Sequence, residues 1–121
     1  MKPKECSRPA TLRVRDTIVF SFRCTHVDRA AGVRMVELVV RAMHEGARVV
    51  VFDLGYVATI ALEGAHQLSI ASTKLGGEGR LRLVGLGERA RLQLGTLAVY
   101  GELRLHSHWA DAVDVNRERA A

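Results

Sequence analysis

The stretch from residue 48 to residue 68, RVVVFDLGYVATIALEGAHQL, constrains the fold more than any other part of this chain. Residues 49–52 are apolar on both faces, which is typical of a central strand that is covered on each side. Asp53 ends this run where the chain must leave the sheet, and an amphipathic helix follows from about Leu62. A buried strand that leads into a helix predicts a parallel α/β arrangement, whose functional surface usually lies at the carboxyl ends of the strands.

Size and composition point to one globular domain. The chain has 121 residues, 48% of them hydrophobic, and its charges are interspersed among apolar residues. This length supports one core and leaves no room for a separate substrate domain. We expect a flexible N-terminal arm over residues 1–10, a single domain over residues 11–117 and a tail over residues 118–121.

The sequence predicts a cytoplasmic protein without direct membrane insertion. Asp53 and Glu63 interrupt the apolar stretch well before the roughly 18 uninterrupted apolar residues of a membrane helix. Residues 1–10 carry charges but no apolar segment of a secretory signal. The chain has two cysteines, Cys6 and Cys24, without CxxC spacing, and we interpret them as free thiols.

The charge balance is basic, with 18 Lys and Arg residues against 13 acidic ones. Such a balance favours an anionic partner. The arginines lie in scattered pairs, such as Arg80 and Arg82, without the interleaved aromatic residues of single-strand binders. We interpret them as a solvated surface and expect no nucleic acid as a partner.

Periodicity predicts the first elements. Apolar residues alternate from Leu12 to Cys24 but are interrupted at Asp16, which favours two short strands that meet at residues 15–17. Asp28 is expected to cap a helix that ends before Gly46. The apolar stripe of this helix is predicted to comprise Val33, Val36, Val40 and Met43.

A second helix is expected over about residues 62–75 and ends at a run of glycines. Its apolar stripe is predicted to comprise Leu62, Ala65, Leu68, Ser72 and Leu75. A strand, a short helix, a strand and a last helix are then expected over residues 80–84, 88–97, 103–106 and 109–117. The fold class is therefore α/β, with a small mixed sheet of four to five strands and about four helices.

The centre of the chain and this element order resemble the STAS domain, the fold of bacterial anti-sigma factor antagonists. In that family a hydrophobic strand ending in Asp-Leu precedes an apolar stretch and an Asp-Ser-x-Gly element, whose Ser is phosphorylated at the start of the next helix. Here Asp53 and Leu54 match the first element, and Val57 and Ile60 match the apolar stretch. Residues 61–64, ALEG, stand at the Asp-Ser-x-Gly position and keep only its Gly.

The resemblance implies a non-catalytic protein-interaction module in a bacterial regulatory or scaffolding complex. The implied partners are an anti-sigma kinase, a stressosome-like assembly, another STAS protein or a second copy in a homodimer. A cytoplasmic STAS subunit of an ABC-type lipid transport complex is the alternative within the same resemblance. Partner binding is expected to use the start of the second helix, through Thr59, Ala61, Leu62, Glu63, Gly64 and His66.

The position of the expected phosphoserine is changed in this chain. A phosphoserine adds about −1.5 to −2 charge beside the positive end of the helix dipole. Leu62 has no hydroxyl and Ala61 has no carboxylate, so this switch is absent. Either Leu62 stays exposed and permanently available to a partner, or it packs inward and the site has lost its role. Thr59 is the nearest hydroxyl, and we expect it in a turn without a regulatory role.

A nucleotide-binding enzyme is the alternative from another class. Residues 85–90, GLGERA, fit the dinucleotide pattern G-x-G-x-x-A between a strand and a helix. The helix is short and basic residues close the next strand where the pattern needs an acid, so a tight turn at Gly85 and Gly87 is the simpler interpretation. His106 and His108 lack further zinc ligands. We therefore predict no catalytic residue, no cofactor and no metal site.

Overall fold

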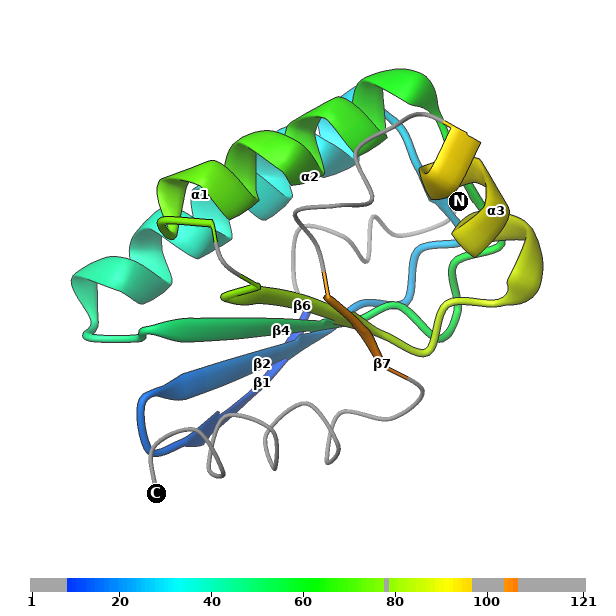
Figure 1. The fold of residues 1–121 in the computed structure, drawn as a ribbon. Helices are drawn as coiled ribbons and strands as arrows, with labels where there is room; N and C mark the ends of the chain where they lie inside the picture. Colours follow the sequence, from blue (N-terminus) through cyan, green and yellow to red (C-terminus); the bar gives the residue numbers. More distant parts are fainter. Residues whose placement is uncertain (1–8, 78, 97–103, 107–121) are drawn as a thin grey trace.

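The computed structural model describes residues 9–77, 79–96 and 104–106 (Figure 1). In this part of the chain a mixed sheet has the strand order β1-β2-β4-β6-β7, and a smaller sheet pairs β3 with β5. The strands are β1 (Ala10–Val14), β2 (Thr17–Ser21), β3 (His26–Val27), β4 (Val49–Asp53), β5 (Thr59–Ile60), β6 (Leu81–Val84) and β7 (Arg104–His106). The helices are α1 (Arg29–His44), α2 (Leu62–Lys74) and α3 (Glu88–Thr96).

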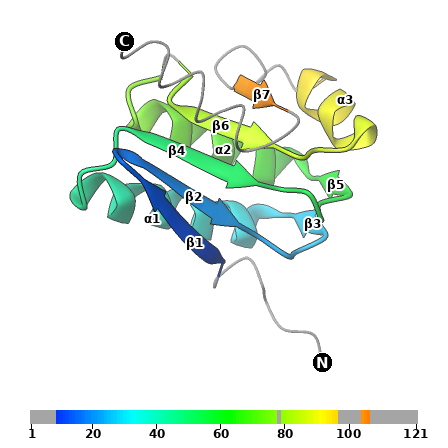
Figure 2. The same ribbon diagram turned by 90° about the horizontal axis from the view of Figure 1, so that it is seen from below.

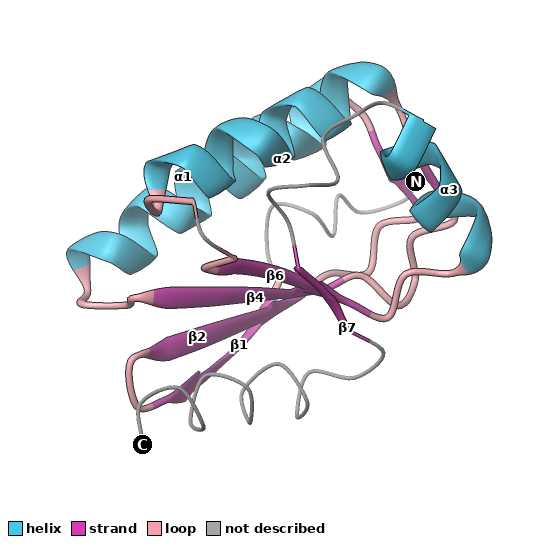
Figure 3. Ribbon diagram, viewed as in Figure 1, coloured by secondary structure: helices cyan, strands magenta, loops and turns pink. Residues whose placement is uncertain are grey.

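The helices α1 and α2 lie side by side on one face of the larger sheet (Figure 2). β1 runs antiparallel to β2, and the remaining neighbours in this sheet are parallel. Figure 3 shows α3 and the long loops gathered at one end of the sheet, where β4 and β6 finish. This architecture confirms the predicted α/β class with a mixed sheet. The predicted fourth helix over residues 109–117 and the tail over residues 118–121 lie outside the described residues. So do residues 1–8 of the predicted arm over residues 1–10, whereas Ala10 already belongs to β1.

The two-strand interpretation of the first segment is confirmed. The chain turns at Arg15, whose φ is 58°, and Val14 pairs with Thr17 across the turn. Burial differs between the two strands, because β1 lies at the sheet edge and Leu12 is exposed, whereas β2 is buried along most of its length. The apolar alternation therefore marks strands correctly but overstates how deeply β1 is buried.

β4 is the central strand, as residues 49–52 predict. Val50 and Phe52 point into the main core under the helices, and Val51 joins a smaller cluster on the other face. Phe52 meets the rings of Phe20 and Phe22 edge-on, with centroids 6.0 and 5.1 Å away. These three rings pack together as part of the main core between the sheet and the helix layer.

Helix α1 begins and ends as predicted. The Oδ1 atom of Asp28 accepts a hydrogen bond from the amide of Ala31 at 2.9 Å, and Gly46 follows the helix with a φ of 91°. A positive φ is the conformation that glycine supplies after a helix end. The capping signals in the sequence therefore located both ends of the helix.

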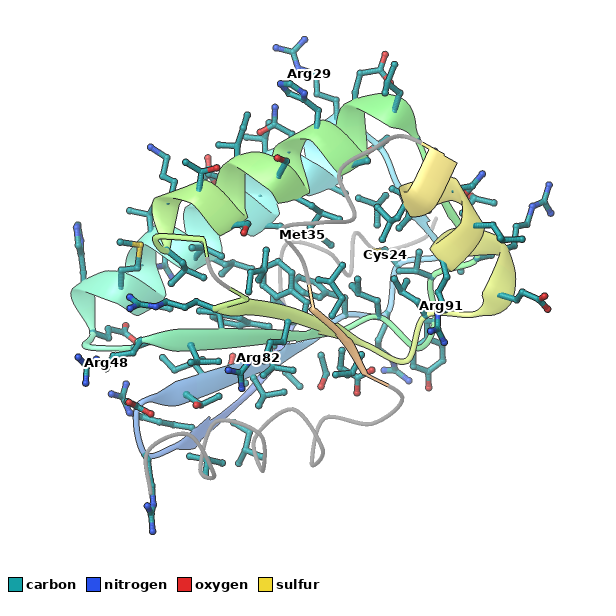
Figure 4. The ribbon with its side chains drawn as sticks, viewed as in Figure 1. Cys24, Arg29, Met35, Arg48, Arg82 and Arg91 are labelled. Atoms are coloured by element: carbon teal, nitrogen blue, oxygen red, sulfur yellow. The ribbon has the colours of Figure 1, made fainter. Side chains whose placement is uncertain are left out.

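The predicted apolar stripe of α1 is only partly confirmed, because Val36 packs against the main core but the two ends of the stripe do not. Val33 and Met43 are 37% and 38% exposed. The side of α1 that packs into the core instead comprises Ala31, Met35, Val39 and Ala42, and Figure 4 shows Met35 lying between the helix layer and the sheet. Apolar residues occur around most of this helix, so periodicity alone could not fix its rotation. The rotation of α1 is fixed by its close contact with α2, because a Cβ added to Gly32 would lie 2.5 Å from the Cβ atom of Gln67.

Two expectations about single residues are also wrong. Cys24 is disulfide-bonded and is not a free thiol. Arg82 is 2% exposed on the sheet face opposite the helices (Figure 4), so it does not belong to a solvated surface. Strand geometry places Arg82 on this face, because it pairs with Val51 and shares that side of the sheet. Its Nε donates to the carbonyl of Gly79 at 3.0 Å. In the described residues no helix is both long enough and apolar enough to span a membrane.

Candidate interaction surface at the start of helix α2

The loop after β2 lies along the loop after β4 and positions the start of α2. The carbonyl of Thr25 accepts hydrogen bonds from the amides of Ala58 and Thr59 at 2.8 and 3.3 Å, and the carbonyl of Val27 accepts one from Ala61 at 2.9 Å. Between these bonds β3 and β5 pair in parallel. The sequence did not predict these short strands, because two residues are too few to show a period.

An aromatic side chain stands out from the turn after β4. Asp53 Oδ1 accepts a hydrogen bond from the amide of Gly55 at 3.1 Å, which tightens this turn. Tyr56 lies at the turn with 60% of its surface exposed. The guanidinium carbon of Arg23 lies 5.7 Å from the ring centroid of Tyr56, within the range of a cation–π contact. Sequence reasoning missed Tyr56, because its exposure depends on this turn.

Leu62 opens α2 and is 60% exposed. Leu62 therefore does not pack into the core. Ala65, Leu68, Ser72 and Leu75, the other members of the predicted stripe, are buried. Ala61 at the N-cap makes no side-chain hydrogen bond to the helix, whereas Glu63 in the first turn suits the helix dipole. The helix therefore starts with an apolar, uncharged residue facing solvent.

Gly64 is buried and has a packing role. A Cβ at this position would overlap the carbonyl oxygen of Val27 and lie 2.9 Å from its Cγ1 atom. Only glycine therefore lets the first turn of α2 approach β3 this closely. Of the other predicted residues, Glu63 and His66 are exposed, while Ala61 and Thr59 are half-buried. The structure thus gathers the predicted residues in one region but leaves Gly64 inside it.

Thr59 lies in β5 and is held by a neighbouring strand. Its Oγ1 atom is 2.6 Å from Nδ1 of His26, with which it pairs across the small sheet. The hydroxyl is therefore engaged in a hydrogen bond at the side of the α2 start.

Helix α3 adds a second apolar residue to this end of the molecule. The side-chain oxygen of Gln93 accepts a hydrogen bond from the amide of Ile60 at 2.8 Å, which links α3 to β5. The adjacent Leu92 is 65% exposed, whereas Ala90 and Leu94 are buried. The sequence did not lead us to Leu92. On a helix, however, a residue two positions from both Ala90 and Leu94 lies on a different side from these buried residues. We call Tyr56, Leu62, Glu63, His66 and Leu92 together the carboxyl-end surface.

A turn after β6 explains the glycine at position 85. Gly85 has a φ of 80°, and a Cβ there would lie 3.0 Å from the Cα atom of Gly55 and 3.2 Å from Asp53 Oδ1. Gly85 is therefore required by backbone conformation and by close packing against the turn after β4. Among the described residues, no group of three or more His, Cys, Asp or Glu side chains is arranged to hold a metal ion.

We expect no phosphate on the start of α2 after incubation with a serine kinase of the partner-switching type. Leu62 has no hydroxyl, and the hydroxyl of the half-buried Thr59 is hydrogen-bonded to His26. Mass spectrometry of the peptide from Val57 to Leu68 checks this. A double variant, Ala61→Asp with Leu62→Ser, restores an acceptor and serves as the positive control. Phosphate on Thr59 in the unmodified protein would contradict the prediction.

Comparison with known proteins gives a structural likeness. No protein-family model matches the chain, and no curated protein sequence matches it. RsbS of Moorella thermoacetica, in a form with one Ser-to-Glu substitution, matches with a TM-score of 0.72 and 16% identity over 93% of this chain and 97% of that one. An anti-sigma factor antagonist of Thermotoga maritima, TM1081, matches with a TM-score of 0.72 and 13% identity over 93% of this chain and 98% of that one.

An NMR structure of TM1081 matches with the same TM-score of 0.72 at 12% identity, over 86% of this chain and 84% of that chain. At these identities the likeness concerns the fold. The chain therefore has a STAS-like fold, as its central segment and element order predict.

Proposed function

We propose that this protein is a non-catalytic STAS-like module that binds a protein partner of a bacterial regulatory complex through the carboxyl-end surface. The observation that carries the proposal is the exposure of large apolar side chains at one end of the sheet: Tyr56 and Leu62 are each 60% exposed and Leu92 is 65% exposed. Single exposed apolar residues are ordinary, but several from neighbouring elements mark an interaction site. Aromatic residues are also enriched in the centres of interfaces.

The backbone around this surface supports the proposal. Hydrogen bonds accepted by Thr25, Val27 and Gln93 connect the loops and helices that carry the exposed side chains. A surface held in this way binds with little ordering cost. The structural likeness to RsbS and to an anti-sigma factor antagonist supports the class of partner, a protein of a regulatory assembly.

Replacing Leu62 tests the proposal. We expect Leu62→Asp to abolish capture of the native partner while the protein stays folded. An aspartate in the first turn suits the helix dipole, so the helix is kept. In an apolar contact, however, the unpaired carboxylate must lose its water. Pull-down from the native host measures binding, and circular dichroism measures folding.

Val33→Asp is the matched control, because Val33 is also an exposed apolar residue in the first half of a helix that starts at the same end of the sheet. It should leave capture unchanged if the carboxyl-end surface is the binding site. Undiminished capture of every native partner by a folded Leu62→Asp protein would rule that surface out. The captured proteins also separate the partner classes, since a kinase or STAS protein indicates regulation and a permease indicates the transport alternative.

A further inference from the structure

A groove lies along the edge of the larger sheet, between β1 and the second half of α1. We call it the β1 groove, and its volume is about 340 Å³. Its lining includes Thr11 of β1, Ile18 and Phe20 of β2, and Leu38, Arg41 and Glu45 of α1. Ile18 and Phe20 also belong to the main core, so the groove opens beside apolar side chains. No residue of the carboxyl-end surface lines it.

β1 leaves one of its two edges open. It is the outermost strand of the larger sheet (Figure 2), and within the described residues it pairs only with β2. In an antiparallel pair, alternate residues direct their backbone N–H and C=O groups toward the partner strand, and the residues between them direct these groups away. Val14 and Thr17 flank the two-residue turn and form the hydrogen-bonded pair that closes such a hairpin. The alternation therefore directs the backbone groups of Thr11 and Arg13 to the open edge.

A strand added to this edge would find an apolar contact on each face of the sheet. Thr11 lies opposite Phe20 and is on the face that carries the helices and the β1 groove. Arg13, two residues further, is on the same face. Leu12 lies between them on the other face and is 46% exposed. Because successive side chains of an extended segment alternate between the faces, one would enter the groove and the next would lie beside Leu12.

The end of the β1 groove nearest the hairpin turn carries an excess of positive charge. The Nη2 atom of Arg13 reaches the end of α1, where it lies 3.6 Å from the position of a Cβ on Gly46. The amide of Arg48 donates to the carbonyl of Asp16 at 2.8 Å, which brings the start of β4 to the same place. Around this end the described residues include the exposed arginines Arg13, Arg15, Arg41 and Arg48 and the acidic residues Asp16 and Glu45.

This charge distinguishes between two occupants of the edge. A second copy that paired through its own β1 would present its Thr11 and Arg13 on the groove side, because directly opposite residues share a face. Its Arg13 would join Arg41 and the Arg13 of the first chain, and like charges placed together are destabilising. A segment that carries carboxylates instead has the complementary charge.

We propose that the open edge of β1 and the β1 groove bind an extended acidic and apolar segment of a partner protein as an additional strand. The backbone of Thr11 and Arg13 pairs with the segment, the groove takes one apolar side chain, and the arginines attract its carboxylates. Recognition by strand addition draws affinity from main-chain hydrogen bonds and specificity from pockets for alternate side chains. This second surface does not depend on the carboxyl-end surface.

The probe is a palindromic peptide, acetyl-Gly-Glu-Val-Leu-Val-Glu-Gly-amide, which offers the same side-chain order in either strand direction. With its leucine opposite Thr11, the leucine enters the groove and one glutamate lies next to Arg13. NMR spectra of the isotope-labelled full chain follow the amides as the peptide is added. We expect saturable shifts at Thr11, Arg13 and Ala42 and none at Leu62. The absence of saturable shifts along β1, or shifts at another surface only, would overturn the proposal.

Methylated peptides separate strand addition from charge attraction on the unchanged protein. In one strand direction the amide of the peptide leucine faces β1, and in the other direction the amides of its valines do. One peptide therefore carries an N-methyl group on its leucine, and another carries N-methyl groups on both valines. We expect one of the two to bind about tenfold more weakly than the unmethylated peptide, and the other to bind as well as it does. Full binding by both would show that no strand is added.

Charge reversal tests the arginines. The double variant Arg13→Glu with Arg41→Glu should bind the glutamate peptide about tenfold more weakly, because two attractive contacts become repulsive. It should also bind a peptide with lysines in place of the glutamates more tightly than the unchanged protein does. Arg89→Glu with Arg91→Glu is the matched control, because both arginines are exposed on α3 and neither lines the groove. Equal affinity of the folded Arg13→Glu, Arg41→Glu protein for both peptides would overturn the assignment of an acidic partner.

Discussion

Phe52→Ala is expected to remove about 3–5 kcal/mol of folding free energy, which is a large part of the roughly 5–15 kcal/mol that stabilises a typical domain. Phe52 is fully buried in the central strand and meets two other phenylalanine rings edge-on. The substitution loses the transfer free energy of the ring and leaves a cavity that β4, with strands on both sides, cannot close. Urea unfolding followed by circular dichroism measures the change, and low solubility of the variant is a further expected sign.

Tyr56→Ala is the matched control, four positions along the chain. Its ring is mostly exposed and lies under the guanidinium of Arg23, so the expected loss is about 0.5–1 kcal/mol. If Phe52→Ala unfolds at the same urea concentration as the unchanged protein, the assignment of β4 as the buried centre of the sheet is wrong.

The elements that could be predicted from the sequence are those with local signals. Asp28 and Gly46 mark the ends of α1 through one capping bond and one positive φ, both of which depend on residues within a few positions. Residues 49–52 mark β4 because no polar side chain interrupts them. The extent of α2 follows from its periodic burial and from the glycines after it. In each case the information lies within about one turn or one strand.

What the sequence could not provide depends on contacts between distant segments. The rotation of α1 is fixed by the approach of Gly32 to Gln67 on α2, which no period within α1 contains. β3 and β5 exist because the loops after β2 and β4 meet at the end of the sheet. The disulfide bonding of Cys24 likewise has no local signal, because the sequence contains no CxxC spacing.

The candidate site also combines features that local sequence predicts with features that depend on contacts between distant segments. The resemblance to the STAS motif placed the site at residues 59–66, and the structure brings these residues together at the start of α2. The resemblance could not decide whether Leu62 faces the core or solvent. Leu62 lies on the predicted apolar stripe of the second helix, but it is the first residue of that stripe. Tyr56 and Leu92 join the surface only through the turn after β4 and the bond between α3 and β5.

Gly64→Ala is the second large effect that we expect, with a net loss of about 1–3 kcal/mol in folding free energy. Alanine favours a helix over glycine by about 1 kcal/mol, so a neutral site would gain stability from this change. Here the added Cβ would meet the backbone carbonyl of Val27, which also accepts the amide of Ala61 and cannot move without disturbing the pairing of β3 with β5.

The matched control is Gly55→Ala, where an added Cβ would meet only Asp53 Oδ1 at 3.4 Å, an ordinary contact distance. We expect it to change the free energy of unfolding by less than about 1 kcal/mol in either direction. Chemical denaturation of both variants under the same conditions gives the comparison. A Gly64→Ala protein as stable as the Gly55→Ala protein would show that α2 does not approach β3 this closely. The glycine at position 64 would then need an explanation other than packing. A loss confined to Gly64→Ala means instead that the fold requires glycine at this position for the packing of α2 against β3, independently of which side chain stands at position 62.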